Sequence, residues 1–398
     1  MTTKQAPGDA SRVYHAVLPH LLASLWTDVR NAHTCAWMVT GVLLGHSSTP
    51  SDWVAGVVSK AQQAQSTERR FARWLNNEAI DAVGIYGPLI LRSLKSWGSS
   101  RLVLALDTSV LFEGWCWICL AVLYRGRAVP LVWRVIEHPS AQVSFSELAP
   151  LLADAQGLLQ ALGVSDILFL ADRGFADTTL MSWLKYAGWN YRIRIKASLK
   201  LYAPQGALLC KVGEVALKPG EAKFYQGVHL TQAHFGPVHV ALAQPHHVDD
   251  AWQVVSSEPT SITTFEEYGW RFHIEEFFLD DKSGAFQLED SHLRDAGKLE
   301  RLILVQALSL LMLVSQGTHV VQQGQRRSVD PHWQRGLSYL KIGWRSLHYA
   351  LSRGLALLCT LQLVPGSDPE MIPPRKGDAR AGVFKLDTFW NLAFRSLS

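Results

Sequence analysis

Cysteine is scarce in this chain. Only five of its 398 residues are cysteine, and their spacing forms no disulfide framework. Cys116 and Cys119 make a CxxC, but no second pair follows that could complete a zinc site, so we expect them to be small buried side chains in a strand. An odd number of cysteines without a framework indicates a reducing compartment, the cytoplasm.

Patterns that direct a chain into a membrane are also lacking. The segment MTTKQAPGDASRVYHAVL does not show the cationic, then apolar, then small-residue order of a signal peptide. The most apolar run, residues 302–314, is interrupted by Gln306 and Ser309 and is too short to span a bilayer. We therefore expect a core helix there, and no membrane partner.

Strong charge and the common catalytic motifs are absent as well. The formal net charge is +4 and the pI about 8.7, which permits a polyanionic partner without requiring one. No HExxH, GxSxG or Walker loop is present. With 48% hydrophobic and 18% charged residues, the chain has the composition of a folded globular protein.

Changes in pattern divide the chain into five predicted regions. Residues 1–95 are helical in periodicity, and residues 96–199 combine short apolar runs with helical patterns, which predicts an α/β domain. Turn signals such as PQG, KPGE and FGP in residues 200–256 predict a β-rich insertion. Residues 257–325 are expected to complete the α/β domain, and residues 326–398 to form a helical C-terminal region.

Two aspartates follow buried apolar runs. RLVLALD ends at Asp107 and DILFLAD ends at Asp172, and such runs are typical of strands buried on both faces. One such aspartate alone is most simply a turn or helix-cap residue. Two of them in one sheet, with Glu275 on a packed helix, instead predict acidic oxygen donors that converge at strand ends. Such donors suit Mg²⁺, and a pair of ions can clamp both oxygens of a phosphoryl displacement.

Residues 268–282, YGWRFHIEEFFLDDK, mix large apolar side chains with many charges. On an ideal helix the apolar side chains form one buried stripe: Trp270, Ile274, Phe277 and Phe278. Opposite them lie three side chains that we expect to be solvated: His273, Glu276 and Asp280. A third, polar row runs along the edge of the apolar stripe: Tyr268, Arg271, Glu275 and Lys282. Of the four carboxylates only Glu275 is predicted to act in catalysis, and Asp281 joins Glu276 and Asp280 as solvated or structural.

The polar row has the spacing Y-x2-R-x3-E-x6-K. This spacing matches the signature of one branch of bacterial DDE transposases, the insertion-sequence-four family, which includes cut-and-paste transposases. LALDTS around Asp107 and LADRGFAD around Asp172 resemble the two other acidic motifs of that family. The resemblance runs from about residue 60 to 315, and the order of two aspartates, β-rich insertion and glutamate also agrees.

The resemblance implies a ribonuclease H-like catalytic core interrupted by the β-rich insertion, with residues 1–95 as a DNA-binding region. It implies Asp107, Asp172 and Glu275 as the catalytic triad that binds Mg²⁺, or Mn²⁺ in its place. It further implies that Tyr268, Arg271 and Lys282 contact the DNA backbone near the cleaved phosphate, in agreement with the polar row. The implied partners are double-stranded DNA, both transposon ends with inverted repeats and target DNA, and a second copy of the chain in the end-paired complex.

Two positions bear on a DNA hairpin intermediate. The residue after the signature arginine is Phe272, where the best-known members of the family have tryptophan. Those members also use a tryptophan in the insertion to hold a flipped base. Trp252 is the only tryptophan in residues 200–256 and is the candidate for that role.

Basic segments supply further candidates for DNA contact. In ERRFARWLNN, Arg69 and Arg73 lie on the side opposite Phe71 and Trp74, which predicts either a DNA-binding or a merely solvated basic face. In YRIRIKASLK, one side of a strand carries three cations: Arg192, Arg194 and Lys196. The alternative there is an edge strand guarded by cations. The C-terminal GQRRS cluster is predicted to serve DNA or subunit contacts, together with the residues His332, Arg335, Lys341 and Arg345 that follow it.

The leading hypothesis is a DNA transposase, located in the bacterial cytoplasm with the nucleoid, that cuts transposon ends and joins them to target DNA by metal-dependent phosphoryl transfer. One alternative is a nuclease with the same fold that acts on its own DNA structure. Another is a catalytically silent DNA-binding regulator. Closely flanking short inverted repeats would favour the transposase over the nuclease.

Overall fold

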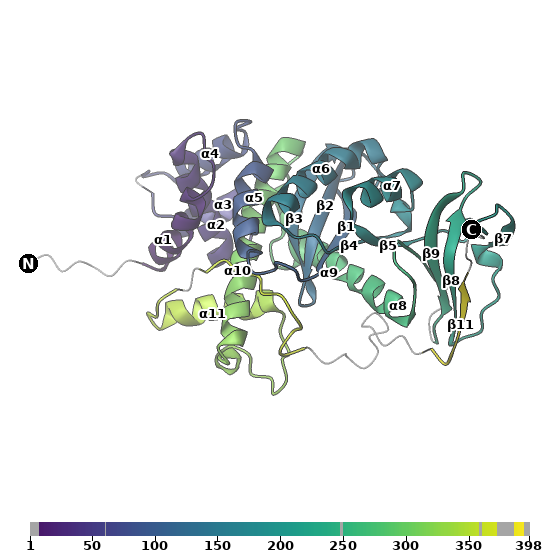
Figure 1. Ribbon diagram of the computed structural model, residues 1–398. Coiled ribbons are helices and arrows are strands. Elements are labelled where there is room, and N and C mark those ends of the chain that lie inside the picture. The colour runs from purple at the N-terminus through teal and green to yellow at the C-terminus, as the bar shows by residue number, and fades with distance from the viewer. Residues whose placement is uncertain (1–7, 60, 247–249, 358–359, 372–385, 394–398) are drawn as a thin grey trace, which may run out of the picture.

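The structure is a computed structural model that describes residues 8–59, 61–246, 250–357, 360–371 and 386–393. Within these residues, eleven strands form one mixed sheet in the order β3-β2-β1-β4-β5-β10-β9-β8-β6-β7, with β11 paired to β8 (Figure 1). Helices gather mainly at the end of the sheet that contains β3 (Figure 1). The α/β class predicted from the sequence is confirmed.

Five strands form the half of the sheet that carries the predicted aspartates. They are β1 (Leu102–Leu111), β2 (Trp115–Tyr124), β3 (Arg127–Glu137), β4 (Ile167–Ala171) and β5 (Asn190–Arg194). β2 pairs antiparallel with both β1 and β3, whereas β1, β4 and β5 are parallel neighbours. β2 is buried along nearly its whole length, so both faces of the sheet are covered there. Cys116 and Cys119 are buried in β2, as predicted.

Two helices connect these strands. α6 (Phe145–Leu162) packs on β2 and β3, and α7 (Thr178–Ala187) packs on β5. A capping box begins α6, because the Ser144 amide donates to Glu147 Oε2 at 2.6 Å. α9 (His273–Leu279), from the signature segment, contacts β1, β2 and β3.

The described part of residues 200–256 contains five more strands, which extend the first sheet instead of forming a sheet of their own. They are β6 (Lys200–Tyr202), β7 (Leu208–Lys211), β8 (Glu221–Leu230), β9 (Phe235–Gln244) and β10 (Trp252–Ser256). β10 returns beside β5 and pairs antiparallel with it. β5 therefore lies between β4 and β10, and the alternative that it is an edge strand is wrong.

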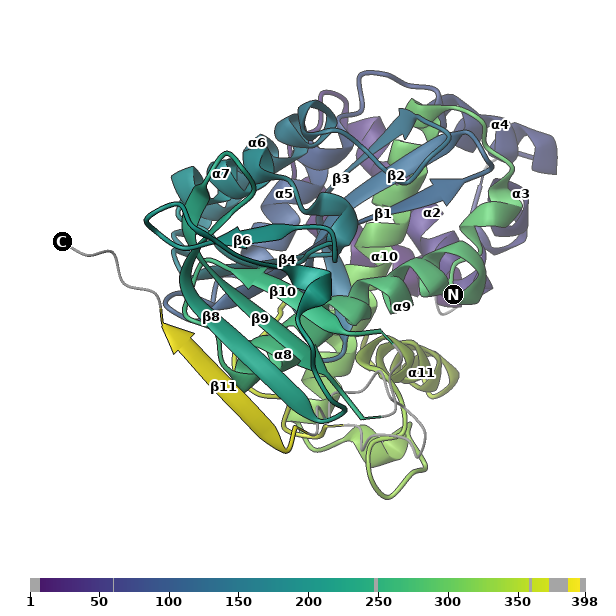
Figure 2. The same cartoon turned by 90° about the vertical axis from the view of Figure 1, so that its right-hand side faces the viewer.

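The C-terminal region is not helical throughout. It contains α11 (Tyr339–Ser352), but β11 (Thr388–Ala393) is a strand that pairs parallel with β8 at the sheet edge (Figure 2). The free backbone groups of β8 offer a template for such a strand, and the sequence TFWNLA is rich in residues that favour strands. Residues 372–385 and 394–398 of the predicted helical region lie outside the described residues.

The N-terminal region is helical where it is described, as the periodicity predicts. Its helices are α1 (Asp9–Leu22), α2 (Val29–Gly45), α3 (Pro50–Trp53), α4 (Ala64–Leu75) and α5 (Ala82–Ser93). α10 (Ala296–Gln322) contacts α2, α4, α5, β3 and α11 and so joins this region to the sheet. α10 is long and apolar enough to cross a membrane, but 83% of its most apolar 18-residue window is buried inside the protein. It is a core helix, longer than the predicted residues 302–314.

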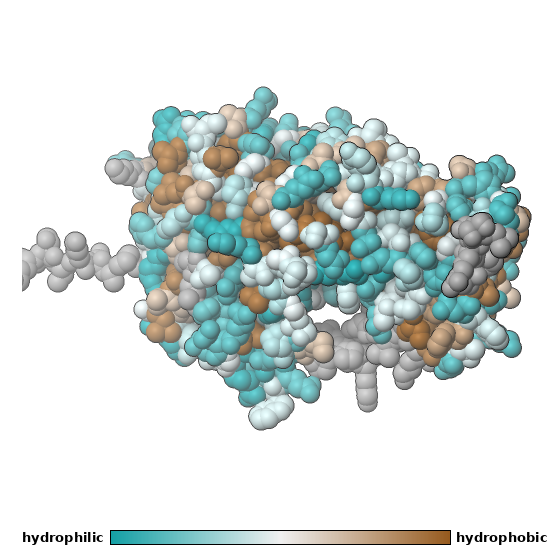
Figure 3. Space-filling model, viewed as in Figure 1, coloured by the Kyte–Doolittle hydropathy of each residue, from teal (hydrophilic) through white to brown (hydrophobic). Residues whose placement is uncertain are grey.

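The surface mixes polar and apolar side chains. On the face shown in Figure 3, apolar residues are interspersed with polar ones, and the largest apolar patch lies near the centre of the view, where α5 and β3 lie in Figure 1.

Candidate active site

Asp107 and Asp172 occupy neighbouring positions on two parallel strands. β1 and β4 pair with Leu106 opposite Ala171, and the next residue on each chain is an aspartate. Asp172 follows β4, and its Oδ1 accepts a hydrogen bond from the Gly174 amide at 2.6 Å. Asp107 does not end its strand, because β1 continues to Leu111 against β2. The prediction of two strand-end aspartates is therefore correct for Asp172 and wrong for Asp107.

The signature segment is not one continuous helix. α8 (Ile262–Gly269) is followed by a 3₁₀ turn (Trp270–Phe272), then α9, then a π-helical turn (Asp280–Gly284). Turns of these three kinds rotate the chain by different amounts per residue, so an ideal α-helical wheel holds only locally. Ile274, Phe277 and Phe278 are buried as predicted.

Several side chains therefore lie where the wheel does not place them. Trp270, predicted to be buried, is 42% exposed, and Tyr268, predicted at the edge, is 1% exposed. The predicted solvated face is also wrong in part: burial lowers the pKa of His273 to about 4. Asp280 accepts a hydrogen bond from Arg127 Nε at 3.1 Å, and Asp281 is fully buried, which raises its pKa.

Arg271 lies between two of the predicted catalytic carboxylates. Its Nη1 is 3.3 Å from Asp107 Oδ2, and its Nη2 is 2.7 Å from Glu275 Oε1. The Arg271 side chain is 7% exposed, whereas that of Glu275 is 46% exposed. The guanidinium also lies over the Phe272 ring, 4.7 Å from its centroid. One arginine thus joins β1 to α9 and holds two motifs of the sequence together.

The electrostatics place all three carboxylates in one neighbourhood. The pKa of Asp107 is raised to about 6, chiefly because the carboxyl is buried; Arg271 and the Thr108 amide oppose the rise, and Asp172 and Glu275 add to it. Burial alone would lower the pKa of Arg271, but Tyr268, Asp107 and Glu275 raise it above its ordinary value. The site therefore contains a buried, permanently charged guanidinium beside an acidic cluster.

The other two signature residues are engaged inside the protein. Tyr268 contacts Trp252 edge to face, with 5.5 Å between ring centroids. Lys282 donates to the Val110 carbonyl of β1 at 3.1 Å and pairs with Glu289 at 3.1 Å. Tyr268 is therefore not accessible to DNA in this conformation, and Lys282 fastens the π-helical turn to the strand that carries Asp107. Trp252 is half-buried at the start of β10, beside the site.

The row of cations predicted on β5 is not a single exposed row. Arg192 is 4% exposed and pairs with Glu258 at 2.9 Å and Glu267 at 2.8 Å. Arg194 donates to the Ala251 carbonyl at 3.2 Å, and of the three cations only Lys196 is exposed. Because β5 is an interior strand covered by α8, the prediction that Arg192 contacts DNA is wrong. Its carboxylate partners were missed, since nothing in the sequence shows that residues 258 and 267 approach β5.

The remaining basic candidates divide into exposed and internal ones. Arg69 and Arg73 are exposed on α4 while Phe71 and Trp74 are buried, as the periodicity predicts. Arg326 and Arg335 are 5% and 3% exposed, and both form ion pairs within the C-terminal region, with Asp330, Glu370 and Asp368. These two arginines are therefore structural, and the prediction that they serve DNA or subunit contacts is wrong.

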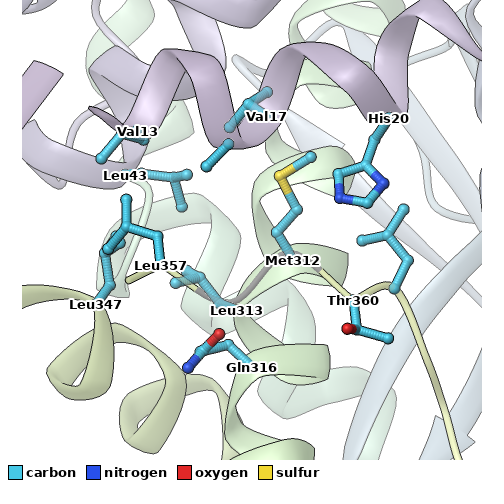
Figure 4. Close-up of a pocket in the computed structure, with 12 residues that line it drawn as sticks. Val13, Val17, His20, Leu43, Met312, Leu313, Gln316, Leu347, Leu357 and Thr360 are labelled. Atoms are coloured by element: carbon cyan, nitrogen blue, oxygen red, sulfur yellow. The ribbon is translucent and has the colours of Figure 1, made fainter. Parts of the chain in front are cut away.

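A small apolar pocket lies elsewhere in the molecule, among α1, α2, α10 and α11 (Figure 4). Its lining includes Val13, Val17, Leu43, Met312, Leu313 and Leu347. None of the three predicted catalytic carboxylates lines it.

The carboxylates suit a hard cation by type but are not preassembled around one. Among the described residues, no group of three or more His, Cys, Asp or Glu side chains is gathered to hold a metal. Mg²⁺ needs only one or two carboxylates and keeps several waters, which Asp107 and Asp172 on adjacent strands could supply. At present the positive charge beside Asp107 and Glu275 comes from Arg271.

Comparison with known proteins adds little. No family model and no curated protein matches the chain. Among solved structures, it is similar to Marinitoga piezophila Argonaute in complex with 5′ OH guide RNA and target DNA, at 10% identity and a TM-score of 0.22. The likeness covers 57% of this chain and 34% of the Argonaute chain, so it spans about a third of that protein's length. A likeness this low carries no argument about function.

Proposed function

We propose that this chain is a metal-dependent DDE transposase of the insertion-sequence-four family, which cuts transposon ends and joins them to target DNA. The observation that carries the proposal is the bridge from Asp107 through Arg271 to Glu275, at 3.3 and 2.7 Å, with Asp172 directly after the adjacent strand. Residues from three separate sequence motifs meet there, as the family signature requires. Two merely structural aspartates on these strands would have no reason to be linked to this glutamate through an arginine of the signature.

The strand arrangement supports the same proposal. The order β3-β2-β1-β4-β5, with β2 antiparallel to its neighbours and β1, β4 and β5 parallel, is the one expected of a ribonuclease H-like core. Asp107 on β1 and Asp172 directly after β4 then occupy adjacent positions in the sheet. Fold alone does not fix function, so the weight rests on the carboxylates and their neighbours.

Asp107, Asp172 and Glu275 are the residues that would hold Mg²⁺, or Mn²⁺ in its place. Such ions, when bound, activate water and stabilise both oxygens of an in-line displacement. The chain's own residues would orient the DNA: Arg271 can hold a backbone phosphate through its forked donors. Trp252, with Phe272 at 6.0 Å between centroids, offers an aromatic surface beside the site for an unstacked base.

The partners follow from the same proposal. The exposed Arg69 and Arg73 on α4 provide a basic face for the phosphates of a transposon end. Two ends must be held together for transposition, which favours a homodimer on DNA with inverted repeats. A transposase of this kind works in the bacterial cytoplasm, at the nucleoid.

The decisive experiment uses labelled DNA that carries the inverted repeats flanking the gene, with purified protein and Mg²⁺. The wild type is compared with two variants, Asp172→Asn and Asp177→Asn. Asp177→Asn is the matched control, because Asp177 caps α7 by accepting a hydrogen bond from the Thr179 amide at 2.9 Å. We expect the wild type and Asp177→Asn to nick at the ends and Asp172→Asn not to.

Other outcomes select the alternatives. Binding without nicking by all three proteins, in Mg²⁺ or Mn²⁺, would favour a DNA-binding regulator. Nicking that ignores the end sequence would favour a nuclease with its own DNA structure as substrate.

A further inference from the structure

Arg271 holds oxygens that a divalent cation would need. Its Nη1 contacts Asp107 Oδ2 and its Nη2 contacts Glu275 Oε1, at 3.3 and 2.7 Å. The second oxygen of Asp107 accepts from the Thr108 amide at 2.8 Å, and Asp172 Oδ1 accepts from the Gly174 amide at 2.6 Å. A cation that enters between Asp107 and Glu275 therefore meets a fixed positive charge at the same place.

The guanidinium cannot leave by losing its proton, because arginine stays charged in proteins. It must move instead, and movement needs another anion to receive it. Arg271 Nε is buried and has no hydrogen-bond partner among the described residues, so the side chain uses only part of its forked donor set here. A backbone phosphate of DNA can engage that fork in two places at once.

We propose that Arg271 is a gate that couples DNA binding to metal binding. In the DNA-free protein the guanidinium holds Asp107 and Glu275 and keeps their affinity for divalent cations low. A phosphate of the bound DNA draws the guanidinium away, and the carboxylates then accept the metal. This inference rests on the proposed function. It adds an order of events: Asp107 and Glu275 become metal ligands only after DNA has bound. Divalent metal without DNA therefore does not activate the enzyme.

Because DNA binding and metal binding are thermodynamically linked, the coupling can be measured either as a change in metal affinity or as a change in DNA affinity. If DNA raises the affinity for metal, metal raises the affinity for DNA by the same factor, and such couplings are typically about 5- to 150-fold. A purely structural Arg271 predicts something different. Its removal would weaken the packing of α9 on β1, and DNA would then leave the metal affinity of the wild type unchanged.

The experiment measures Mn²⁺ binding to DNA-free protein from the electron paramagnetic resonance signal of the free ion. Arg271→Gln is expected to bind Mn²⁺ about tenfold more tightly than the wild type, within the usual range of such couplings. Adding Asp107→Asn to that variant should abolish the gain. The control is Arg134→Gln, which removes a guanidinium on β3 that pairs with Asp154 of α6 at 3.1 Å and with none of the three predicted catalytic carboxylates; its Mn²⁺ affinity should equal that of the wild type.

A second measurement needs no variant at the gate. Pre-cleaved end DNA added to the wild type should raise its Mn²⁺ affinity by a factor similar to that of Arg271→Gln, so the test stands even if that variant fails to fold. Equal Mn²⁺ affinity with and without DNA, in a wild-type protein that nicks transposon ends, would overturn the gate and leave the transposase proposal intact. A wild type that never nicks authentic ends would instead remove the proposed function itself.

Discussion

Arg192 on β5 and Glu267 on α8 form a nearly buried ion pair, with 2.8 Å between guanidinium and carboxylate. Arg192 also contacts the Ser256 hydroxyl at 2.9 Å. Glu258 joins Arg192 to Arg101 at the start of β1, at 2.9 and 2.8 Å. Glu267 immediately precedes Tyr268, so this network fastens the beginning of the signature segment to the sheet. The position of Arg271 beside Asp107 depends on that anchor.

Replacing Arg192 by Gln is therefore expected to destabilise the fold. The change leaves the largely buried carboxylates of Glu258 and Glu267 with one partner fewer. Breaking a buried ion pair lowers the free energy of unfolding by about 3–5 kcal/mol. Denaturant unfolding followed by circular dichroism measures the loss. Lys196→Gln, at an exposed position on the same segment, should stay within about 0.5 kcal/mol of the wild type. Equal stability of the two variants, with weaker DNA binding by Arg192→Gln, would restore the role in DNA contact that the sequence suggests.

The buried carboxyl of Asp107 makes the metal-free protein sensitive to pH. Burial raises its pKa from 3.8 in the unfolded chain to about 6 in the folded protein. The Asp107 carboxyl therefore contributes fully to folding stability below pH 3.8, and this contribution is lost as the pH rises through about 6. Asp107→Asn removes this titration. We expect it to stabilise the metal-free protein at pH 8 by at most about 3 kcal/mol, the equivalent of the shift, and to show no gain near pH 4.

Thermal unfolding in a chelator across this pH range tests the expectation for Asp107, with Asp177→Asn as the reference. A stability loss in Asp107→Asn at pH 8 would mean that the ion pair with Arg271 outweighs the cost of burial.

Much of the sheet is predictable from the sequence because it depends on local patterns. The apolar runs before Asp107 and Asp172 are β1 and β4, and the turn-rich residues 200–256 are strands. The end of β1 was misplaced because its last residues pair with β2 alone, beyond the reach of β4. The part of β1 after Asp107 is a strand because it pairs with β2. The apolar sequence before Asp107 therefore does not indicate where β1 ends.

The sequence predicts which residues belong to the candidate site, but it does not predict which residues each of them contacts. The spacing of the signature identifies Arg271 and Glu275, and Arg271 does contact both Asp107 and Glu275. An ideal wheel could not foresee the 3₁₀ turn that exposes Trp270 and buries Tyr268. Arg192 was misread for a different reason: its partners Glu258 and Glu267 are distant in sequence, and alternation along a strand does not say what covers each face.

The exposed cations of α4 predict a salt-dependent contribution to DNA binding. Each phosphate contact contributes about 0.9 to the slope of log affinity against log salt, so Arg69→Gln with Arg73→Gln should lower that slope by about 2. Fluorescence anisotropy with end DNA over a range of salt concentrations measures it. Arg30→Gln is a suitable control, because that exposed guanidinium is already paired with Asp28 at 2.7 Å. If the slope of log affinity against log salt is unchanged in the double variant, Arg69 and Arg73 do not contact DNA and this face of α4 is only solvated.

The crossing of α10 and α11 depends on two glycines that let the helices touch. A Cβ on Gly343 would lie 1.9 Å from the Leu313 carbonyl oxygen, and one on Gly317 would lie 2.1 Å from that of Tyr339. Because both obstacles are backbone, Gly343→Ala must separate the helices, and we expect a loss of about 3 kcal/mol or more in unfolding free energy. Gly157→Ala in α6 meets nothing within 4 Å and should instead stabilise the protein by about 0.5–1 kcal/mol, through helix propensity. Differential scanning calorimetry of both variants tests the contrast, and similar melting temperatures would show that the two helices are not in close contact in solution.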